Sequence, residues 1–388
     1  MTDLQIKYLG AGGLYIRRGN DVLLTAPFFS NPTLKRLAIG TIAANPEAID
    51  QSLSSMRDML NSTQVILVGH AHYDHLMDLP YILSEYTPNA LVYGNRTAYH
   101  TLAAAVDTSR LIALNDQMGT ADTAGKWIIL SGGKVRFMAF QSDHAPHFKG
   151  ITLYKGKREK NLDHLPRRAA NWREGQTLSY LIDFMGEDKT TIDFRLYYQD
   201  AASNPKQGFP PPLVHSHHLD RIDLALLCVA NYDEVSDYPE SIVSQLQPRR
   251  VVLIHWENFF SRLPRLNRDL RTVPFLNVNK FIKRLEKALP EDCSESSVIN
   301  LGLDEFKKCK NESIDHAVME NTKLAVVYPI DIGWSDIGSW PSIFNLSKKD
   351  KKNNLIKGSV EIKNVKNSFI QSENQQVMVI GQKDLIII

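Results

Sequence analysis

Cysteine is scarce in this chain of 388 residues, with only Cys228, Cys293 and Cys309. Their spacing forms no metal-binding pair and no disulfide framework, and few unpaired cysteines are typical of a reducing compartment. No apolar stretch approaches the roughly 18 residues that span a membrane. The polar start Met1-Thr2-Asp3 begins no signal peptide. We therefore expect a cytoplasmic protein without a transmembrane segment.

Net charge is also nearly absent, because 45 basic residues almost balance 43 acidic ones and leave a formal charge of +2. That charge is too small to indicate a nucleic-acid partner. The content of 43% hydrophobic and 23% charged residues is typical of a globular protein. The length exceeds what one hydrophobic core usually spans, which predicts two domains. We expect a small-molecule substrate, while a homo-oligomer stays open.

Metal-binding side chains are concentrated in the segment Gly69-His70-Ala71-His72-Tyr73-Asp74-His75. Residues 65–68 before it read as a short buried strand, and apolar residues at helical spacing follow from Leu76 to Glu85. The donors are therefore predicted on the loop between a strand and a helix, a common position for sites in α/β proteins. Imidazole and carboxylate donors together suit zinc, iron or manganese.

This segment resembles the His-x-His-x-Asp-His signature of metallo-β-lactamase-fold hydrolases. Three further strand-like runs follow in the family's order, each ending in a candidate ligand. They are Arg136–Phe140 before Ser142-Asp143-His144-Ala145-Pro146-His147, Leu196–Gln199 before Asp200, and Val251–Ile254 before His255. Near the N-terminus, Leu4–Leu9, Gly13–Arg17 and Val22–Thr25 read as strands joined by turns.

The resemblance implies an α/β fold, the four-layer αββα sandwich, over a hydrolase domain of residues 1–300. It also implies two divalent metal ions, zinc first, with Mn²⁺ or Fe²⁺ as alternatives. The expected ligands are His70, His72 and His144 for one ion, Asp74, His75 and His255 for the other, and Asp200 as a bridge. His147 follows the same strand as His144, and we favour His144 because it lies closer to the strand end.

Such a centre would hydrolyse an ester, lactone or phosphodiester with a metal-bridged hydroxide. Asp74 has an expected catalytic role in orienting that hydroxide or passing a proton. One departure is Ala26, where many members of the family carry an aspartate that supports a ligand histidine. The alternative to an enzyme is a non-catalytic metal-binding or scaffold protein.

The substrate is less well indicated than the metal. Candidate substrate-binding residues are His147, His217, His218, Asn231 and Tyr232. Residues 148–178 form a basic insertion, which is either a flap that recruits an anionic substrate or a solvated loop. Its basic residues are Lys149, Lys155, Lys157, Arg158, Lys160, Arg167, Arg168 and Arg173.

Arginine usage changes abruptly near residue 303. Residues 1–303 contain 20 Arg and 13 Lys, whereas residues 304–388 contain 12 Lys and no Arg. The segments Glu312–Glu320 and Asp331–Trp340 resemble bacterial mannose-1-phosphate guanylyltransferases, and Asp336 matches an aspartate that helps bind Mg²⁺ in that family. We predict a partial, strand-rich guanylyltransferase-like segment over residues 304–388. A nucleotide-sugar function is a further alternative, but the family's Gly-rich nucleotide loop is missing from this sequence.

Overall fold

The computed structural model describes residues 4–147, 150–204, 207–210, 222–261, 271–289, 316, 319–322 and 337–388. The chain divides into two compact units, Met1–Asn300 and Leu301–Ile388, and each is considered by itself below. In the described part of the chain, no helix is both long enough and apolar enough to cross a membrane.

The first sheet of unit 1 has six strands in sequence order, β1 to β6. Strands β1, β2 and β3 are antiparallel, and β3 to β6 are parallel. Their bounds are β1 Leu4–Tyr8, β2 Leu14–Arg18, β3 Asp21–Thr25, β4 Val65–Leu67, β5 Leu91–Gly94 and β6 Leu111–Ala113. The three N-terminal strands agree with the sequence prediction to within one residue at each end.

The second sheet also has six strands, in the order β12-β11-β10-β9-β8-β7. Strands β7 to β10 are antiparallel, whereas β10, β11 and β12 are parallel. Their bounds are β7 Ile128–Ile129, β8 Val135–Gln141, β9 Leu178–Met185, β10 Ile192–Gln199, β11 Leu224–Cys228 and β12 Val251–Ile254.

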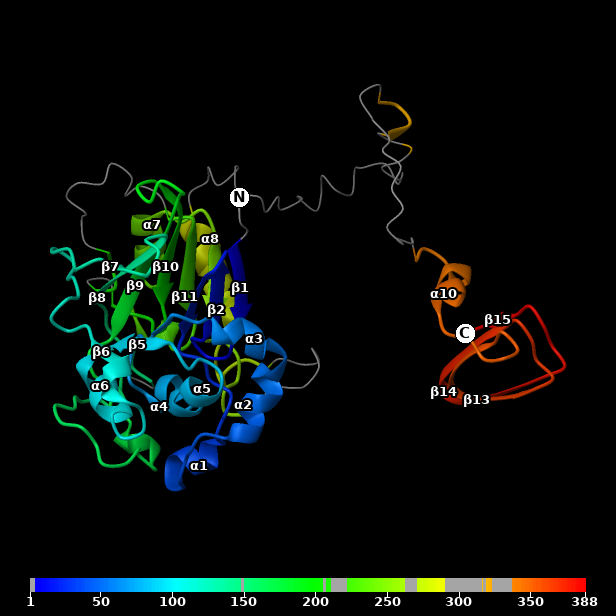
Figure 1. Ribbon diagram of the computed structural model, residues 1–388, viewed down its shortest axis with the longest axis horizontal. Helices are drawn as coiled ribbons and strands as arrows, with labels where there is room; N and C mark the ends of the chain where they lie inside the picture. Colours follow the sequence, from blue (N-terminus) through cyan, green and yellow to red (C-terminus); the bar gives the residue numbers. More distant parts are fainter. Residues whose placement is uncertain are drawn as a thin grey trace. The chain divides into compact units, whose positions relative to one another are not determined.

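Alternating side chains divide the interior of unit 1 into three cores, because successive residues of a strand point to opposite faces. Ile16 and Leu67 of the first sheet pack with Ile182 and Leu226 of the second, so the two sheets lie face to face. The outer face of the first sheet packs against α2, α3, α5 and α6, and that of the second against α7 and α8. Unit 1 is therefore a four-layer αββα sandwich, which confirms the predicted fold (Figure 1).

The helices of unit 1 are short. The α-helices are α1 Leu34–Ile39, α2 Pro46–Leu53, α3 Arg57–Asn61, α4 Tyr73–Leu76, α5 Leu79–Glu85, α6 Arg96–Leu102, α7 Glu240–Leu246 and α8 Val278–Ala288. Four 3₁₀ turns accompany them at Ser54–Met56, Thr108–Arg110, Ala169–Asn171 and Tyr232–Glu234.

Unit 2 contains α10 (Trp340–Leu346) and a parallel sheet of β13 (Leu355–Lys363), β14 (Phe369–Ile380) and β15 (Ile386–Ile387). A straight strand of nine residues would span roughly 27 Å, and the five residues between β13 and β14 could not return that far. Strand β13 therefore bends, and its pairing register shifts beside Gly358, which has φ +79°. The chain winds as a parallel coil (Figure 1) around buried Val365 and Ile370. The strand-rich C-terminal segment is confirmed.

Candidate metal centre

The candidate ligands of unit 1 all follow the carboxyl ends of strands. His70 and His72 come after β4, His144 after β8, Asp200 after β10 and His255 after β12. Because β3 to β6 and β10 to β12 are parallel runs, these ends meet at one edge of the sandwich. His70, His72, Asp74, His75, Asp200 and His255 are buried, and His144 is half-buried.

Asp74 and His75 lie on a helix rather than on the predicted loop. Helix α4 begins at Tyr73, one residue after His72, and α5 begins separately at Leu79 with Pro80 in its first turn. Proline has no backbone N–H for a continuous helix, which explains why the predicted helix from Leu76 to Glu85 is broken. The first turn of α4 holds the two side chains in a fixed direction.

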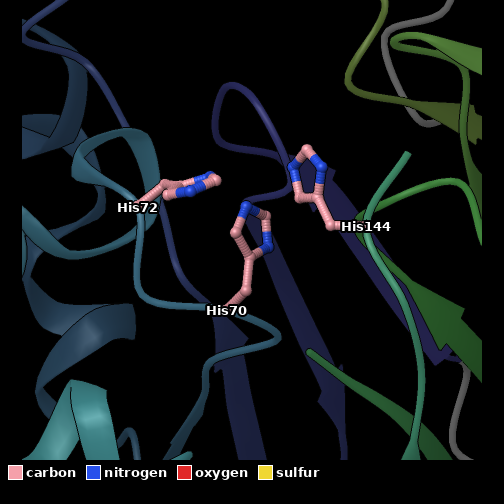
Figure 2. Close-up of side chains that lie close together, drawn as sticks. All are labelled: His70, His72 and His144. Carbon is pink, nitrogen blue, oxygen red and sulfur yellow. The ribbon is translucent and has the colours of Figure 1, made fainter. Parts of the chain in front are cut away.

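Three histidines form the first triad of the centre, His70, His72 and His144. Ring centroids of His70 lie 4.7 Å from those of both His72 and His144, and the latter two are 5.0 Å apart. Figure 2 shows the three rings turned toward one another, with His70 between the other two. Three imidazole nitrogens thus face one small volume.

Asp74, His75 and His255 form the second triad. Asp74 Oδ2 lies 3.5 Å from His75 Nε2 and 3.3 Å from His255 Nε2. His255 has φ 56° and donates its backbone N–H to the carbonyl of Ala11 over 3.0 Å. The left-handed backbone is uncommon for a residue other than glycine, and such strain is typical of functional sites.

Asp200 contacts one histidine of each triad. Its Oδ1 lies 3.2 Å from His70 Nδ1, and its Oδ2 lies 3.4 Å from His75 Nδ1. The carboxylate fits only because Gly69 has no side chain, since a Cβ there would lie 2.1 Å from Asp200 Oδ1. Gly12 leaves similar room beside the Asp200 Cβ, at 2.9 Å. Two glycines from different loops therefore create the space that joins the triads.

Burial sets the protonation of the first triad. It lowers the pKa of His70 and His72 well below the usual value and that of His144 to about 4, with help from the charges of the neighbouring histidines. Neutral imidazoles keep their lone pairs available for a metal. In the second triad burial opposes ionisation of Asp74, but His75 and His255 outweigh it and hold its pKa well below the usual value.

Several buried atoms of the two triads and of Asp200 have no hydrogen-bond partner among the residues that the structure describes. These atoms are His72 Nε2, both ring nitrogens of His75, His255 Nδ1 and Asp200 Oδ2. Each unpartnered buried polar atom costs about 1–3 kcal/mol. Divalent cations bound by imidazole and carboxylate would remove that cost, so the residues present fit a metal centre.

His147 lies beside the first triad but outside it. Its ring stacks on His144 with centroids 4.7 Å apart, and its Nδ1 accepts a hydrogen bond from the Leu153 N–H. The structure thus brings His144, the residue favoured from the sequence, into the group with His70 and His72.

Of the other substrate-binding candidates, Asn231 lines the cavity over the two triads. Tyr232 does not: its hydroxyl donates to the Asn277 carbonyl and its ring packs on Phe281 of α8. Tyr232 follows Asn231 directly, and the turn there carries its ring into the core behind the second sheet, which corrects that prediction. His217, His218 and the Mg²⁺-associated Asp336 lie outside the described residues.

The cavity over the triads has a volume of about 360 Å³. Much of its wall is apolar. It is formed by Leu34 and Leu37 of α1, Leu153 and Tyr154 of the insertion, and Phe259, Phe260 and Phe275. Tyr154 belongs to the basic insertion, and its ring centroid lies 6.0 Å from that of His72. These residues lie far apart in the chain, so only the fold reveals the wall.

Ala26 is buried, and among the described residues Asp74 and Asp200, themselves proposed ligands, are the carboxylates that contact a triad histidine. Asp78 instead accepts the backbone N–H groups of Phe29 and Ser30. Glu257 accepts the Tyr8 hydroxyl and the N–H of Ala11. Since Ala11 also accepts the His255 N–H, Glu257 braces the loop on which His255 rests.

Comparison with known proteins gives different results for the two units. No family model matches the chain. Similar solved structures include the metallo hydrolase Igni18 of Ignicoccus hospitalis, with 15% identity, TM-score 0.41 and coverage of 74% of this chain and 91% of that one. The metallo-beta-lactamase fold protein YhfI of Bacillus subtilis has 10% identity and TM-score 0.40, with coverage of 74% of this chain and 94% of that one. The diiron beta-hydroxylase CmlA of Streptomyces venezuelae has 12% identity and TM-score 0.38, with coverage of 69% of this chain and 48% of that one.

Curated relatives are mannose-1-phosphate guanylyltransferases. Mannose-1-phosphate guanylyltransferase 2 of Escherichia coli O157:H7 is 46% identical over 90 residues, which are 23% of this chain and 19% of that protein. RfbM of Salmonella typhimurium is 37% identical over 123 residues, 30% of this chain and 26% of that protein. The expected resemblance to guanylyltransferases is confirmed. The chain spans only about a fifth to a quarter of the length of the curated relatives it matches.

Proposed function

We propose that unit 1 is a metal-dependent hydrolase that cleaves an ester, lactone or phosphodiester bond. One observation carries the proposal: two triads of buried donors, each converging on one point, are joined by Asp200 beneath an open cavity. Structural centres are closed by protein ligands on all sides, whereas catalytic ones leave a position for water or substrate.

In this proposal His70, His72 and His144 hold one divalent ion, and Asp74, His75 and His255 hold the second. Asp200 bridges them, since its carboxylate contacts one histidine of each triad. Zinc is the first candidate, and Mn²⁺ or Fe²⁺ suit the same donors. When bound, such ions would lower the pKa of a coordinated water and polarise the bond under attack.

The residues around the centre favour an orienting role for Asp74. The pKa of its carboxyl is held well below the usual value by His75 and His255, so Asp74 is ionised at neutral pH. A carboxylate whose pKa lies well below the usual value is a weak proton acceptor, but it still accepts hydrogen bonds that direct a nucleophile. Of the two roles expected from the sequence, positioning therefore fits better than proton transfer.

The cavity wall narrows the substrate to one with an apolar part. Leu37, Tyr154 and Phe260 enclose the space above the triads, and Asn231 adds an amide that can donate to a carbonyl or phosphoryl oxygen. A substrate with a short acyl chain or an apolar ring next to the scissile bond matches this volume of about 360 Å³.

The test compares His72→Ala with His147→Ala, two cavity histidines of which only His72 belongs to a triad. Elemental analysis should show loss of bound metal in His72→Ala, and kcat/KM across a panel of esters, lactones and phosphodiesters should fall at least about 1,000-fold. His147→Ala should keep its metal. Full turnover by metal-free His72→Ala would refute the proposal.

A result in which the wild-type chain binds metal but hydrolyses nothing in the panel would instead support the scaffold alternative. Ala26 is the observation that favours that alternative, since the expected supporting aspartate is absent. Metal content and turnover must therefore be measured on the same preparation.

A further inference from the structure

Two arginines of the basic insertion converge on a hollow that the proposed hydrolysis does not use. Arg158 and Arg173 are half-buried and line a space of about 360 Å³. The rest of its wall is formed by Leu162, His164, Pro166 and Asn171. Elsewhere in the insertion the basic side chains that the structure describes, Lys155, Lys157, Lys160, Arg167 and Arg168, are exposed.

The segment that carries the two arginines is held firmly to unit 1. The Arg158 N–H donates to Thr97 Oγ1 of α6 over 2.9 Å, and the Leu162 N–H donates to the His100 carbonyl over 3.0 Å. On its far side, the Arg167 carbonyl accepts the Ile42 N–H over 2.8 Å. These bonds argue against the alternative of a merely solvated loop.

The charges of the two arginines are not compensated. Burial lowers the pKa of Arg158, and the charge of Arg173 lowers it further. Arg158 Nη2 donates to the Asn171 carbonyl and Arg173 Nη1 to that of Lys155. Within the described part of the chain neither guanidinium forms an ion pair, and Arg158 Nε is buried without a hydrogen-bond partner.

A fold that holds two like charges together at a hollow is stabilised by an anion between them. Guanidinium groups are planar forks whose N–H donors match phosphate oxygens in pairs. A carboxylate offers two oxygens, whereas a phosphate offers enough to engage both forks. Phosphate is therefore the anion that uses the donors present most fully.

We propose that Arg158 and Arg173 form a binding site for a phosphate group, outside the metal centre. The site lies on the same segment as the cavity wall, because Glu174, next to Arg173, donates its N–H to the carbonyl of Tyr154 over 3.1 Å. The hollow is open, so the phosphate is free or belongs to a larger phosphate ester. The two sources share the chemistry that the arginines recognise.

Calorimetric titration of the full chain with inorganic phosphate tests the site. Arg158→Gln and Arg173→Gln should each weaken binding at least about tenfold, because each removes a charge-assisted pair of bonds. Lys160→Gln, an exposed position of the same segment, is the matched control and should bind within twofold of the wild type. Arg173→Lys keeps the charge but loses the fork, and it should lie between the wild type and Arg173→Gln.

Binding that is equal in the wild type and both glutamine variants, or absent from the wild type, would overturn the proposal. Melting temperatures equal to that of the wild type show that a variant is folded. If Arg173→Gln fails to fold, Arg173→Lys provides the test at that position. Turnover of an uncharged ester reports on the metal centre alone, so a failure of this site and a failure of the hydrolase proposal are distinguishable.

KM values identify the source of the phosphate. If it is part of the substrate, Arg173→Gln should raise KM for a phosphate-bearing ester and leave KM for an uncharged ester unchanged. If it is a separate small ligand, both KM values should stay the same while phosphate binding is still lost. Either result supports the site.

Discussion

Units 1 and 2 differ in what characterises them: unit 1 has a cluster of potential metal ligands, and unit 2 has sequence similarity to curated proteins. Unit 1 gathers seven potential metal ligands into connected groups. Unit 2 resembles guanylyltransferases, with 46% identity over 90 residues to the Escherichia coli O157:H7 protein, and none of the three potential metal groups in the described residues lies in it. Similarity to the curated relatives and the groups of potential metal ligands therefore lie in different units.

The physical basis of the contrast is the size of the interior. Unit 1 has three cores that hold the strand ends, and therefore the side chains that follow them, in place. Unit 2 winds around a core of Val365, Ile370 and Val379. In a coil each turn is stabilised by its neighbours, so many residues are constrained without any of them forming a site.

Among the changes that test this comparison between the two units, the largest expected effect is that of Gly69→Ala in unit 1. The added methyl would overlap the Asp200 carboxylate, with distances of 2.1 and 2.3 Å to its oxygens, and should displace it. Overpacking costs about 1–3 kcal/mol, and loss of the proposed bridge should lower bound metal and reduce kcat/KM about 100-fold or more.

Gly186→Ala is the matched control, because its methyl would meet only the ends of Asp193 and Asp188 at 3.1 and 3.2 Å. Retention of metal and turnover in Gly69→Ala would show that Asp200 does not join the two triads.

Unit 2 should respond to Ile370→Ala without a change at the metal centre. Ile370 is fully buried in the small core, and its truncation should cost about 2–5 kcal/mol of unfolding free energy. Hydrogen exchange should show unit 2 opening while metal content stays constant. The same change at Ile380, which is 56% exposed, should cost less than about 0.5 kcal/mol. Equal destabilisation of both units by Ile370→Ala would contradict the expectation that they unfold independently.

A pH-dependent effect is expected at Glu174 in unit 1. Burial raises the pKa of Glu174 from 4.5 to about 7, so the folded state prefers the protonated carboxyl. The unfolded chain then binds fewer protons between about pH 4.5 and 7, and stability should fall as pH rises through that window. Glu174→Gln stays neutral, so it should lack this decline and melt higher than the wild type at pH 8.

Melting temperatures at pH 5 and pH 8 provide the measurement for Glu174→Gln. Glu159→Gln replaces an exposed carboxyl of the same insertion and should leave the slope as in the wild type. An unchanged slope in Glu174→Gln would mean that another group is responsible for it.

The smallest expected effect is that of removing unit 2. A chain that ends at Asn300 keeps all seven proposed ligands and the three cores of unit 1. Its metal content and kcat/KM should stay within about twofold of the full chain. Loss of turnover in the shortened chain would show that unit 2 contributes to the metal centre. Formation of GDP-mannose by the full chain would favour the nucleotide-sugar alternative instead.

Local patterns made much of unit 1 predictable. The ends of the strands before His70, His144, Asp200 and His255 can be predicted from the sequence, because each buried strand is a continuous apolar run that stops just before the candidate ligand. The break between α4 and α5 was not foreseen, although Pro80 marks it. The bend of β13 at Gly358 depends on pairing with β14, which periodicity does not encode.

The sequence by itself determined the kind of centre, since the types and order of its donors are chain properties: His70 to His75, then His144, Asp200 and His255. Only the tertiary structure decided which side chains meet. It turned Tyr232 into the core, placed Tyr154 in the cavity wall and brought Arg158 next to Arg173. These outcomes depend on contacts between residues far apart in the chain, and such contacts leave no periodic or local signal.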